Sequence, residues 1–184
     1  MISAFSLRPT KAELEKCAVD YWTGMSDAQR DEEKNTFEAG LAIREGDRTP
    51  ATLQTIVHWK SPRIVPLFKK NSTEEVKAAL DVAVSHTTVA EAMVALIKLQ
   101  GVGIPVASAI LTAIYPERYT VIDFRALETL GYTDVTFYIA YLDFCRDLAK
   151  QDLVPAQIDL PAPTKLRALD RALWQWSKEN PSSD

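Results

Sequence analysis

The chain has 184 residues, of which 47% are apolar, so it is long enough to bury the core of one medium domain or of two small lobes. Its formal charge of -4 and isoelectric point of about 5.3 exclude a nucleic-acid-binding surface spread over the whole molecule, and leave only local basic patches. The two cysteines, Cys17 and Cys145, lie far apart without a ligand pattern, which favours reduced core thiols over a disulfide framework or a metal cluster.

Helix starts are marked repeatedly along the chain by capping boxes, in which a hydroxyl and a later carboxylate or amide bond the first free N–H groups reciprocally. The boxes are Thr10–Glu13, Ser26–Gln29, Ser72–Glu75 and Thr88–Glu91. The first predicts a helix to about Trp22, and the second predicts a longer helix that ends near Gly46. Thr49 followed by Pro50 predicts the next start, because proline at the first helical position loses no hydrogen bond.

The predicted helix that ends near Gly46 has an apolar and a charged face. We expect Phe37, Leu41 and Ile43 to be buried. The acidic run DEEK at 31–34 is expected to face water.

The helical pattern breaks at residues 60–63, Lys-Ser-Pro-Arg. A residue before proline is pushed out of the helical region, so Ser61 is expected to end one helix and to cap a new one. Between residues 60 and 70 there is no acidic residue, and the basic ones are Lys60, Arg63, Lys69 and Lys70. Two interpretations of this basic segment stay open, a surface for phosphates and an ordinary solvated helix face.

Two apolar helical runs are joined by Gly101, Val102 and Gly103. Glycine tolerates positive φ angles and close approach of another backbone, so paired glycines can expose several N–H groups together, as phosphate sites do. Pro105 predicts the start of the helix that follows. Further helices are expected at about 123–130, 134–150 and 164–178. Since the only strand-like run, YTVID at 119–123, is short, the predicted class is all-α.

The sequence LQGVG at 99–103 is followed by an apolar helix, by Pro116 in a loop and then by Asp123. This order resembles the helix-hairpin-helix, Gly/Pro-rich loop and Asp pattern of the HhH-GPD superfamily of DNA glycosylases. In that family the position two after the second hairpin glycine lies eighteen residues before the catalytic Asp. Here Pro105 lies 18 residues before Asp123. The resemblance covers residues 99–125 position by position.

The resemblance implies an all-α, two-lobed fold in a single domain over residues 1–184, with the helix-hairpin-helix at about 88–114 and the Gly/Pro–Asp loop at about 115–123. It implies that hairpin N–H groups grip a phosphate of double-stranded DNA and that the target base flips into a pocket between the lobes. The implied catalytic residue is Asp123. The implied DNA-binding residues are Gly101, Val102, Gly103, Lys60, Ser61 and Arg63. The residues implied to line the base pocket or to stack on the base are Trp59, Tyr115 and Tyr119.

In such an enzyme Asp123 would stabilise the positive charge that develops on the sugar as the N-glycosidic bond breaks, or orient an attacking water. In bifunctional members of the family the position of Pro105 is a lysine that forms a Schiff base. Proline has no amine, so the resemblance implies a monofunctional DNA glycosylase without lyase activity. Members with an iron–sulfur cluster have four clustered cysteines near the C-terminus, where this chain has only Cys145, so we expect no metal and no other cofactor.

These residues also have structural interpretations. Asp123 before a helix is a common N-cap, Arg125 can pair with it, and Trp59 can be a core residue. Two other functions therefore stay open, a DNA-binding helix-hairpin-helix protein without catalysis and a helical protein-interaction domain. The sequence indicates neither the base removed nor a protein partner. Without an apolar leader or an apolar run of about 18 residues, we expect no membrane association and a cytoplasmic location, at the nucleoid if the protein is bacterial.

Overall fold

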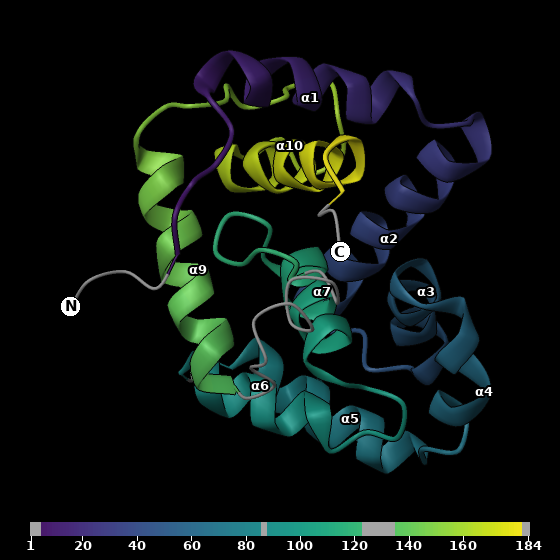
Figure 1. Ribbon diagram of the computed structural model, residues 1–184. Coiled ribbons are helices and arrows are strands. Elements are labelled where there is room, and N and C mark those ends of the chain that lie inside the picture. Colours follow the sequence, from purple (N-terminus) through teal and green to yellow (C-terminus); the bar gives the residue numbers. More distant parts are fainter. Residues whose placement is uncertain (1–4, 86–87, 123–134, 182–184) are drawn as a thin grey trace.

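The computed structural model describes residues 5–85, 88–122 and 135–181, and all regular secondary structure within these ranges is helical (Figure 1). The helices are α1 (Lys11–Thr23), α2 (Asp27–Glu45), α3 (Pro50–Lys60), the 3₁₀ turn η1 (Pro62–Ile64), α4 (Val65–Phe68), α5 (Thr73–Val84), α6 (Val89–Ile97), α7 (Ile104–Ile114), α9 (Val135–Lys150) and α10 (Lys165–Glu179). The all-α class is thus confirmed. No helix in the described ranges is both long and apolar enough to cross a membrane. The helix expected at 123–130 lies outside them.

The capping boxes form where the sequence predicts them. The Thr10 N–H donates to Glu13 Oε2 at 2.7 Å, and the Glu13 N–H donates to Thr10 Oγ1 at 3.3 Å. The same reciprocal pattern opens α2, α5 and α6. Gly46 ends α2 with φ +124°. Local sequence therefore sets these helix ends.

The helices bury two apolar clusters. The larger cluster takes side chains from α2 to α7 and from α9, and Leu166 from α10. The smaller one, which we call the terminal cluster, consists of Leu14, Cys17, Ala18, Leu148, Val154, Ala168, Leu169 and Ala172. It forms because the first and last long helices, α1 and α10, lie side by side in Figure 1 and pack extensively. Helices α9 and α10 contribute to both clusters and so connect them.

Helices α2 and α7 meet at Gly40 with their backbones in contact. A Cβ atom on Gly40 would lie 2.0 Å from the carbonyl oxygen of Ala113 and 2.9 Å from the amide nitrogen of Ile114. Small residues at 107–109 are buried on α7, as expected for close helix packing. This crossing fixes α7, the helix that follows the hairpin, against the N-terminal half of the chain.

Three expectations about single side chains are wrong. Glu33, in the run expected to face water, is 0% exposed, since it lies four residues before buried Phe37 on the same face of α2. Leu41 is 51% exposed, because it borders a surface cavity instead of the core. The Ser61 side chain makes no capping bond, because a 3₁₀ turn follows and the Ile64 N–H donates to the Ser61 carbonyl at 3.2 Å.

Candidate nucleic-acid interface

The predicted hairpin is present between α6 and α7. The Leu99 N–H donates to the Leu96 carbonyl at 3.1 Å, and the Val102 N–H donates to the Leu99 carbonyl at 3.0 Å. Gly101 has φ +82°, a conformation that L side chains rarely adopt. Gly103, by contrast, is extended, and a Cβ atom on it would meet only Pro105 Cδ, at 3.8 Å. The first glycine is therefore needed for the turn itself, and the second leaves space in front of α7.

Among the residues that the structure describes, the first N–H groups of α7 have no hydrogen-bond partner. Gly103 is the N-cap residue, and no described side chain caps this end. Pro105, in the first turn, has no N–H, while the N–H groups of Gly103, Ile104 and Val106 have no partner within the helix. The helix dipole adds a positive potential at the same place. An anion such as a phosphate oxygen is the natural partner for these groups.

The hairpin rests on the backbone of η1 and α4. A Cβ atom on Gly101 would lie 3.2 Å from the amide nitrogen of Phe68 and 3.3 Å from the carbonyl oxygen of Ile64. Asn71, just after α4, joins the two segments, since its Oδ1 accepts from the Gln100 N–H at 2.8 Å and its Nδ2 donates to the Gln100 carbonyl at 3.1 Å. The structure thus brings the hairpin and the predicted basic segment together.

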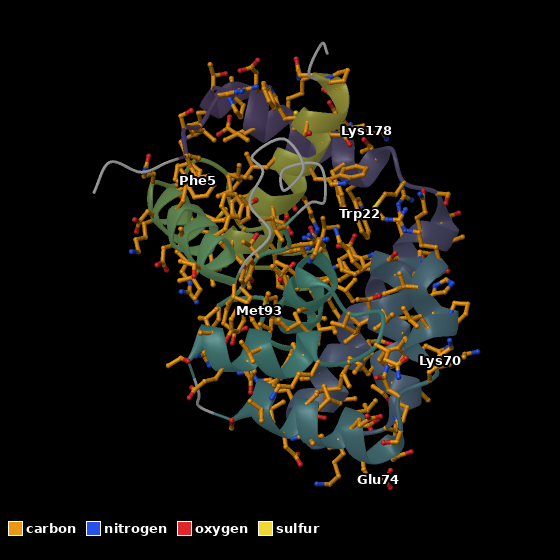
Figure 2. The ribbon with its side chains drawn as sticks, turned by 60° about the horizontal axis from the view of Figure 1, so that its bottom comes forward. Phe5, Trp22, Lys70, Glu74, Met93 and Lys178 are labelled. Atoms are coloured by element: carbon orange, nitrogen blue, oxygen red, sulfur yellow. The ribbon has the colours of Figure 1, made fainter. Side chains whose placement is uncertain are left out.

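Exposed cationic side chains lie on the segments that meet at the hairpin. Arg63 of η1 and Lys69 and Lys70 after α4 are exposed, and so is Lys98 after α6, which the sequence did not single out. Figure 2 shows Lys70 at the outer edge of the molecule. Two acidic residues, Glu74 and Glu75, lie in the first turn of α5, and Glu75 is engaged in its capping box. We call Arg63, Lys69, Lys70, Lys98 and the hairpin residues 101–103 the hairpin surface.

A buried group of charged residues, which the sequence did not indicate, joins α2 to α10. Glu33 Oε1 accepts from Arg171 Nη2 at 2.6 Å, from Arg171 Nε at 3.0 Å and from Arg167 Nη2 at 3.0 Å. Glu33 Oε2 accepts from the Tyr21 hydroxyl at 2.7 Å. Arg167 also pairs with Asp170, nearly one turn along α10. We call Glu33, Arg167, Asp170 and Arg171 the ionic cluster.

The ionic cluster controls the charge of its own carboxylates. Burial acts to raise the pKa of Glu33, but the positive charges of Arg167 and Arg171 outweigh it and hold the pKa at about 2. Burial raises the pKa of Asp170, against the opposing charge of Arg167. The four side chains are all less than a tenth exposed, so they pair with one another in place of water. The arrangement holds α10 against α2 and is a structural feature.

Trp59 and Lys60, at the end of α3, face the ionic cluster. The Trp59 ring centroid lies 6.1 Å from that of Phe37 and 5.4 Å from the guanidinium carbon of Arg167. Burial raises the pKa of Asp170, and the charge of Lys60 offsets a small part of that rise. The structure therefore divides the predicted basic segment, with Lys60 on the side of the ionic cluster and Arg63 on the hairpin surface. Trp59 is a packing residue between α2 and α10.

Tyr115 and Tyr119 lie at the other end of α7 from the hairpin. Helix α7 has 11 residues, and at 1.5 Å per residue it is about 16 Å long. The Tyr115 hydroxyl donates to the Val84 carbonyl at 3.2 Å, and the Arg44 guanidinium carbon lies 4.8 Å from its ring centroid. Tyr119 is 3% exposed, and burial raises its pKa. Both rings have structural partners far from the hairpin surface.

The loop between these tyrosines is fixed by side chains from three directions. Arg146 of α9 donates to the Arg118 carbonyl from Nε at 3.0 Å and from Nη2 at 2.7 Å. Thr164, which caps α10, donates to the Pro116 carbonyl at 2.9 Å. Arg44 of α2 pairs with Glu117 at 3.2 Å.

After this loop the chain runs back along α7. The Thr120 carbonyl accepts from the Tyr138 hydroxyl at 3.0 Å. The Ile122 N–H donates to Ser108 Oγ at 3.1 Å, and Ser108 Oγ in turn donates to the Pro105 carbonyl at 2.8 Å. Ile122 is thereby attached to the part of α7 that lies next to the hairpin.

Asp123, the catalytic candidate, follows Ile122 in the sequence but lies outside the described residues, as Arg125 does. Its two possible roles, active carboxylate and helix cap, both remain predictions. The structure does describe Ser108, whose side chain holds the preceding residue, Ile122. The sequence did not indicate this role, because a serine in an apolar helix is interpreted only as a small packing residue.

A surface cavity of about 470 Å³ lies between α2, the end of α7 and the 157–163 loop. Phe37, Leu41 and Ile114 form much of its apolar wall, and Lys34 and Arg44 border it. Because it is at the C-terminal end of α7, it is separate from the hairpin surface.

In the described parts of the chain, no three His, Cys, Asp or Glu side chains lie close enough together to hold a metal ion. The hairpin surface is the candidate site because it places the N-terminus of α7 beside exposed cationic side chains. Comparisons with family models, with curated proteins and with solved structures found no match to this chain.

Proposed function

We propose that this protein binds double-stranded DNA through the hairpin surface and is a monofunctional DNA glycosylase that uses Asp123. The observation that carries the proposal is the seating of the hairpin, with the uncapped N-terminus of α7, directly on the exposed cationic segment of η1 and α4. N–H groups without a partner in the described residues, together with exposed cations, are the donors that a DNA phosphate backbone requires.

In this proposal the two kinds of donor have different tasks. The N–H groups at the start of α7 bind one phosphate by direct hydrogen bonds, which fix orientation without reading sequence. Lys69, Lys70 and Arg63 neutralise neighbouring phosphates and release counterions, which makes the affinity depend on salt. A local surface of this kind is compatible with the net charge of -4, because screening confines charge effects to about 10 Å.

The proposed chemistry is hydrolysis of the N-glycosidic bond. The bond between the base nitrogen and C1′ breaks, a water oxygen adds to C1′, and the base leaves with a proton. Asp123 stabilises the positive charge on the sugar during this step or orients the water. Pro105 offers no amine for a covalent intermediate, so abasic DNA is the expected product and strand cleavage is not.

The test combines binding and product release on a panel of duplexes that each contain one damaged or modified base. Wild-type protein should bind duplex DNA with an affinity that falls steeply with salt, and Lys69→Ala with Lys70→Ala should reduce the salt slope by about 2. Lys11→Ala with Lys34→Ala removes the same charge from exposed positions on α1 and α2 and should leave the slope unchanged. Release of free base by wild type and not by Asp123→Asn would support the enzyme.

The outcomes separate the rival functions. Salt-dependent binding without product from any duplex would indicate a DNA-binding protein without catalysis. No salt-dependent binding at low ionic strength would contradict the whole proposal and favour a protein-interaction domain. Equal product from Asp123→Asn would contradict the role of Asp123 alone.

A further inference from the structure

Asn71 lies where three elements meet. It follows α4, and its N–H and its Nδ2 both donate to the Phe68 carbonyl, at 3.1 and 2.7 Å. The next residue, Ser72, caps α5. On its other side Asn71 bonds the backbone of Gln100 in the hairpin. The residue thus connects the end of the basic segment to the turn between α6 and α7.

The side chain uses all of its hydrogen-bonding capacity except one acceptor lone pair. Oδ1 accepts from the Gln100 N–H at 2.8 Å, and the two hydrogens on Nδ2 go to the carbonyls of Gln100 and Phe68, at 3.1 and 2.7 Å. Only a primary amide presents an acceptor and two donors on one flat group, and among side chains only Asn and Gln carry one. A carboxylate would repel both carbonyls, and serine would be too short to reach all three groups.

The bonds to Gln100 restrict both the position and the orientation of the hairpin, because they hold the N–H and the carbonyl of one of its residues. The adjacent Gly101 lies against the backbone of Phe68 and Ile64 with no side chain between them. The Asn71 amide is the side chain whose hydrogen bonds join the hairpin to the segment of Lys69 and Lys70, and it adds to the backbone contact of Gly101 in setting the position of the α7 N-terminus.

We infer that Asn71 is a positioning residue for DNA binding, which orients the free N–H groups of α7 and the lysines toward neighbouring phosphates of one strand. This inference rests on the proposed function. Asn71 itself contacts no phosphate. Without it, the hairpin must be oriented during binding, so the affinity falls while the number of neutralised phosphates stays the same.

The experiment measures the affinity of Asn71→Ala for a duplex oligonucleotide at several salt concentrations. We expect an affinity loss of about five- to thirtyfold at every salt concentration, with an unchanged slope of log K against log salt. Hydrogen exchange of the Gln100 N–H should become faster. Asn35→Ala, the same substitution at an exposed position of α2, should change none of these values.

A merely structural role would lower the melting temperature and leave the affinity of the folded protein unchanged, which would overturn the inference. A reduced salt slope would also overturn it, since Asn71 would then act on ionic contacts. If Asn71→Ala does not fold, Asn71→Ser keeps a turn-forming polar residue and carries the same expected affinity loss. If wild type does not bind DNA, the proposed function fails first; if wild type binds and both Asn71 variants bind equally well, only this inference fails.

Discussion

At the scale of single residues, Glu33 shows how completely a buried carboxylate has to be satisfied. One of its oxygens accepts three hydrogen bonds from two arginines, and the other accepts one from Tyr21. A buried ionised carboxylate without such partners would lose its hydration and gain no compensating hydrogen bond or ion pair. Without Glu33 the two arginines would lose a shared counter-charge, although Arg167 would keep its pairing with Asp170.

We predict that Glu33→Gln lowers the free energy of unfolding by about 3 to 5 kcal/mol, because it leaves Arg167 and Arg171 buried without their main counter-charge. The effect depends on pH. The folded pKa of Glu33 is about 2, below the ordinary value of 4.5, so its stabilisation is complete above about pH 4.5 and is lost as the pH falls toward 2. The free energy of unfolding, measured in urea between pH 5 and 2.5, should therefore change less with pH for the variant than for wild type.

Glu38→Gln on the same helix is the matched control. Glu38 Oε1 lies 3.9 Å from Lys34 Nζ, and both side chains are exposed. Such a surface ion pair stabilises a protein by less than about 1 kcal/mol. Equal losses from the two substitutions would contradict the role of the ionic cluster, and parallel pH curves for wild type and Glu33→Gln would contradict the low pKa.

At the scale of elements, the crossing of α2 and α7 depends on one glycine. Gly40→Ala should destabilise the protein by about 3 kcal/mol, since its Cβ would lie 2.0 Å from the Ala113 carbonyl oxygen and the helices must separate. In an exposed helix the same change is stabilising by about 0.5 to 1 kcal/mol, so the sign itself is informative. Thermal and urea unfolding measure the change.

Gly103→Ala is the control for this prediction. Gly103 is extended and a Cβ on it would be 3.8 Å from Pro105 Cδ, so stability should fall by no more than about 1 kcal/mol, the cost of alanine at a helix N-cap. An unchanged melting temperature for Gly40→Ala would show that α2 and α7 are not in backbone contact.

Helix ends were predictable from the sequence because their causes are local. Each capping box needs only two side chains three residues apart, and all four formed. The burial of Glu33 was not predictable in the same way, because its partner Arg171 lies 138 residues later. A helical-wheel count would have given one signal, since Glu33 shares a face with Phe37 and Gly40.

The candidate site was predictable in part for the same reason. The hairpin follows from glycines and a proline close together in the sequence, and it is present. Its seating on the basic segment and the bonds from Asn71 depend on tertiary contacts, for which neither residue type nor spacing gave a signal. The proposed aromatic contacts of Trp59, Tyr115 and Tyr119 could not be judged from sequence, because aromatic residues beside charges occur in packed interiors as well as in binding sites.

At the scale of the whole molecule, the two apolar clusters each contain one cysteine. Cys17 belongs to the terminal cluster and Cys145 to the larger one. Burial raises the pKa of both thiols, that of Cys145 to about 12, so neither is reactive while its cluster stays closed. Thiol labelling therefore reports the opening of each cluster separately.

We predict that Cys17, measured in Cys145→Ala, is labelled at least about tenfold faster under native conditions than Cys145, measured in Cys17→Ala. The terminal cluster is the smaller one and is built mainly from the two ends of the chain, which open most readily. Both variants should retain the wild-type circular dichroism spectrum. Equal labelling rates would show that the two clusters open only together.

The segment from Tyr115 to Ile122 is held by contacts from α2, α7, α9 and the cap of α10. The conformational entropy of ordering this stretch, about 1 to 2 kcal/mol per residue, is therefore already lost on folding. A molecule that binds beside residue 122 meets a preorganised wall, so its affinity is not reduced by the need to order that part of the chain.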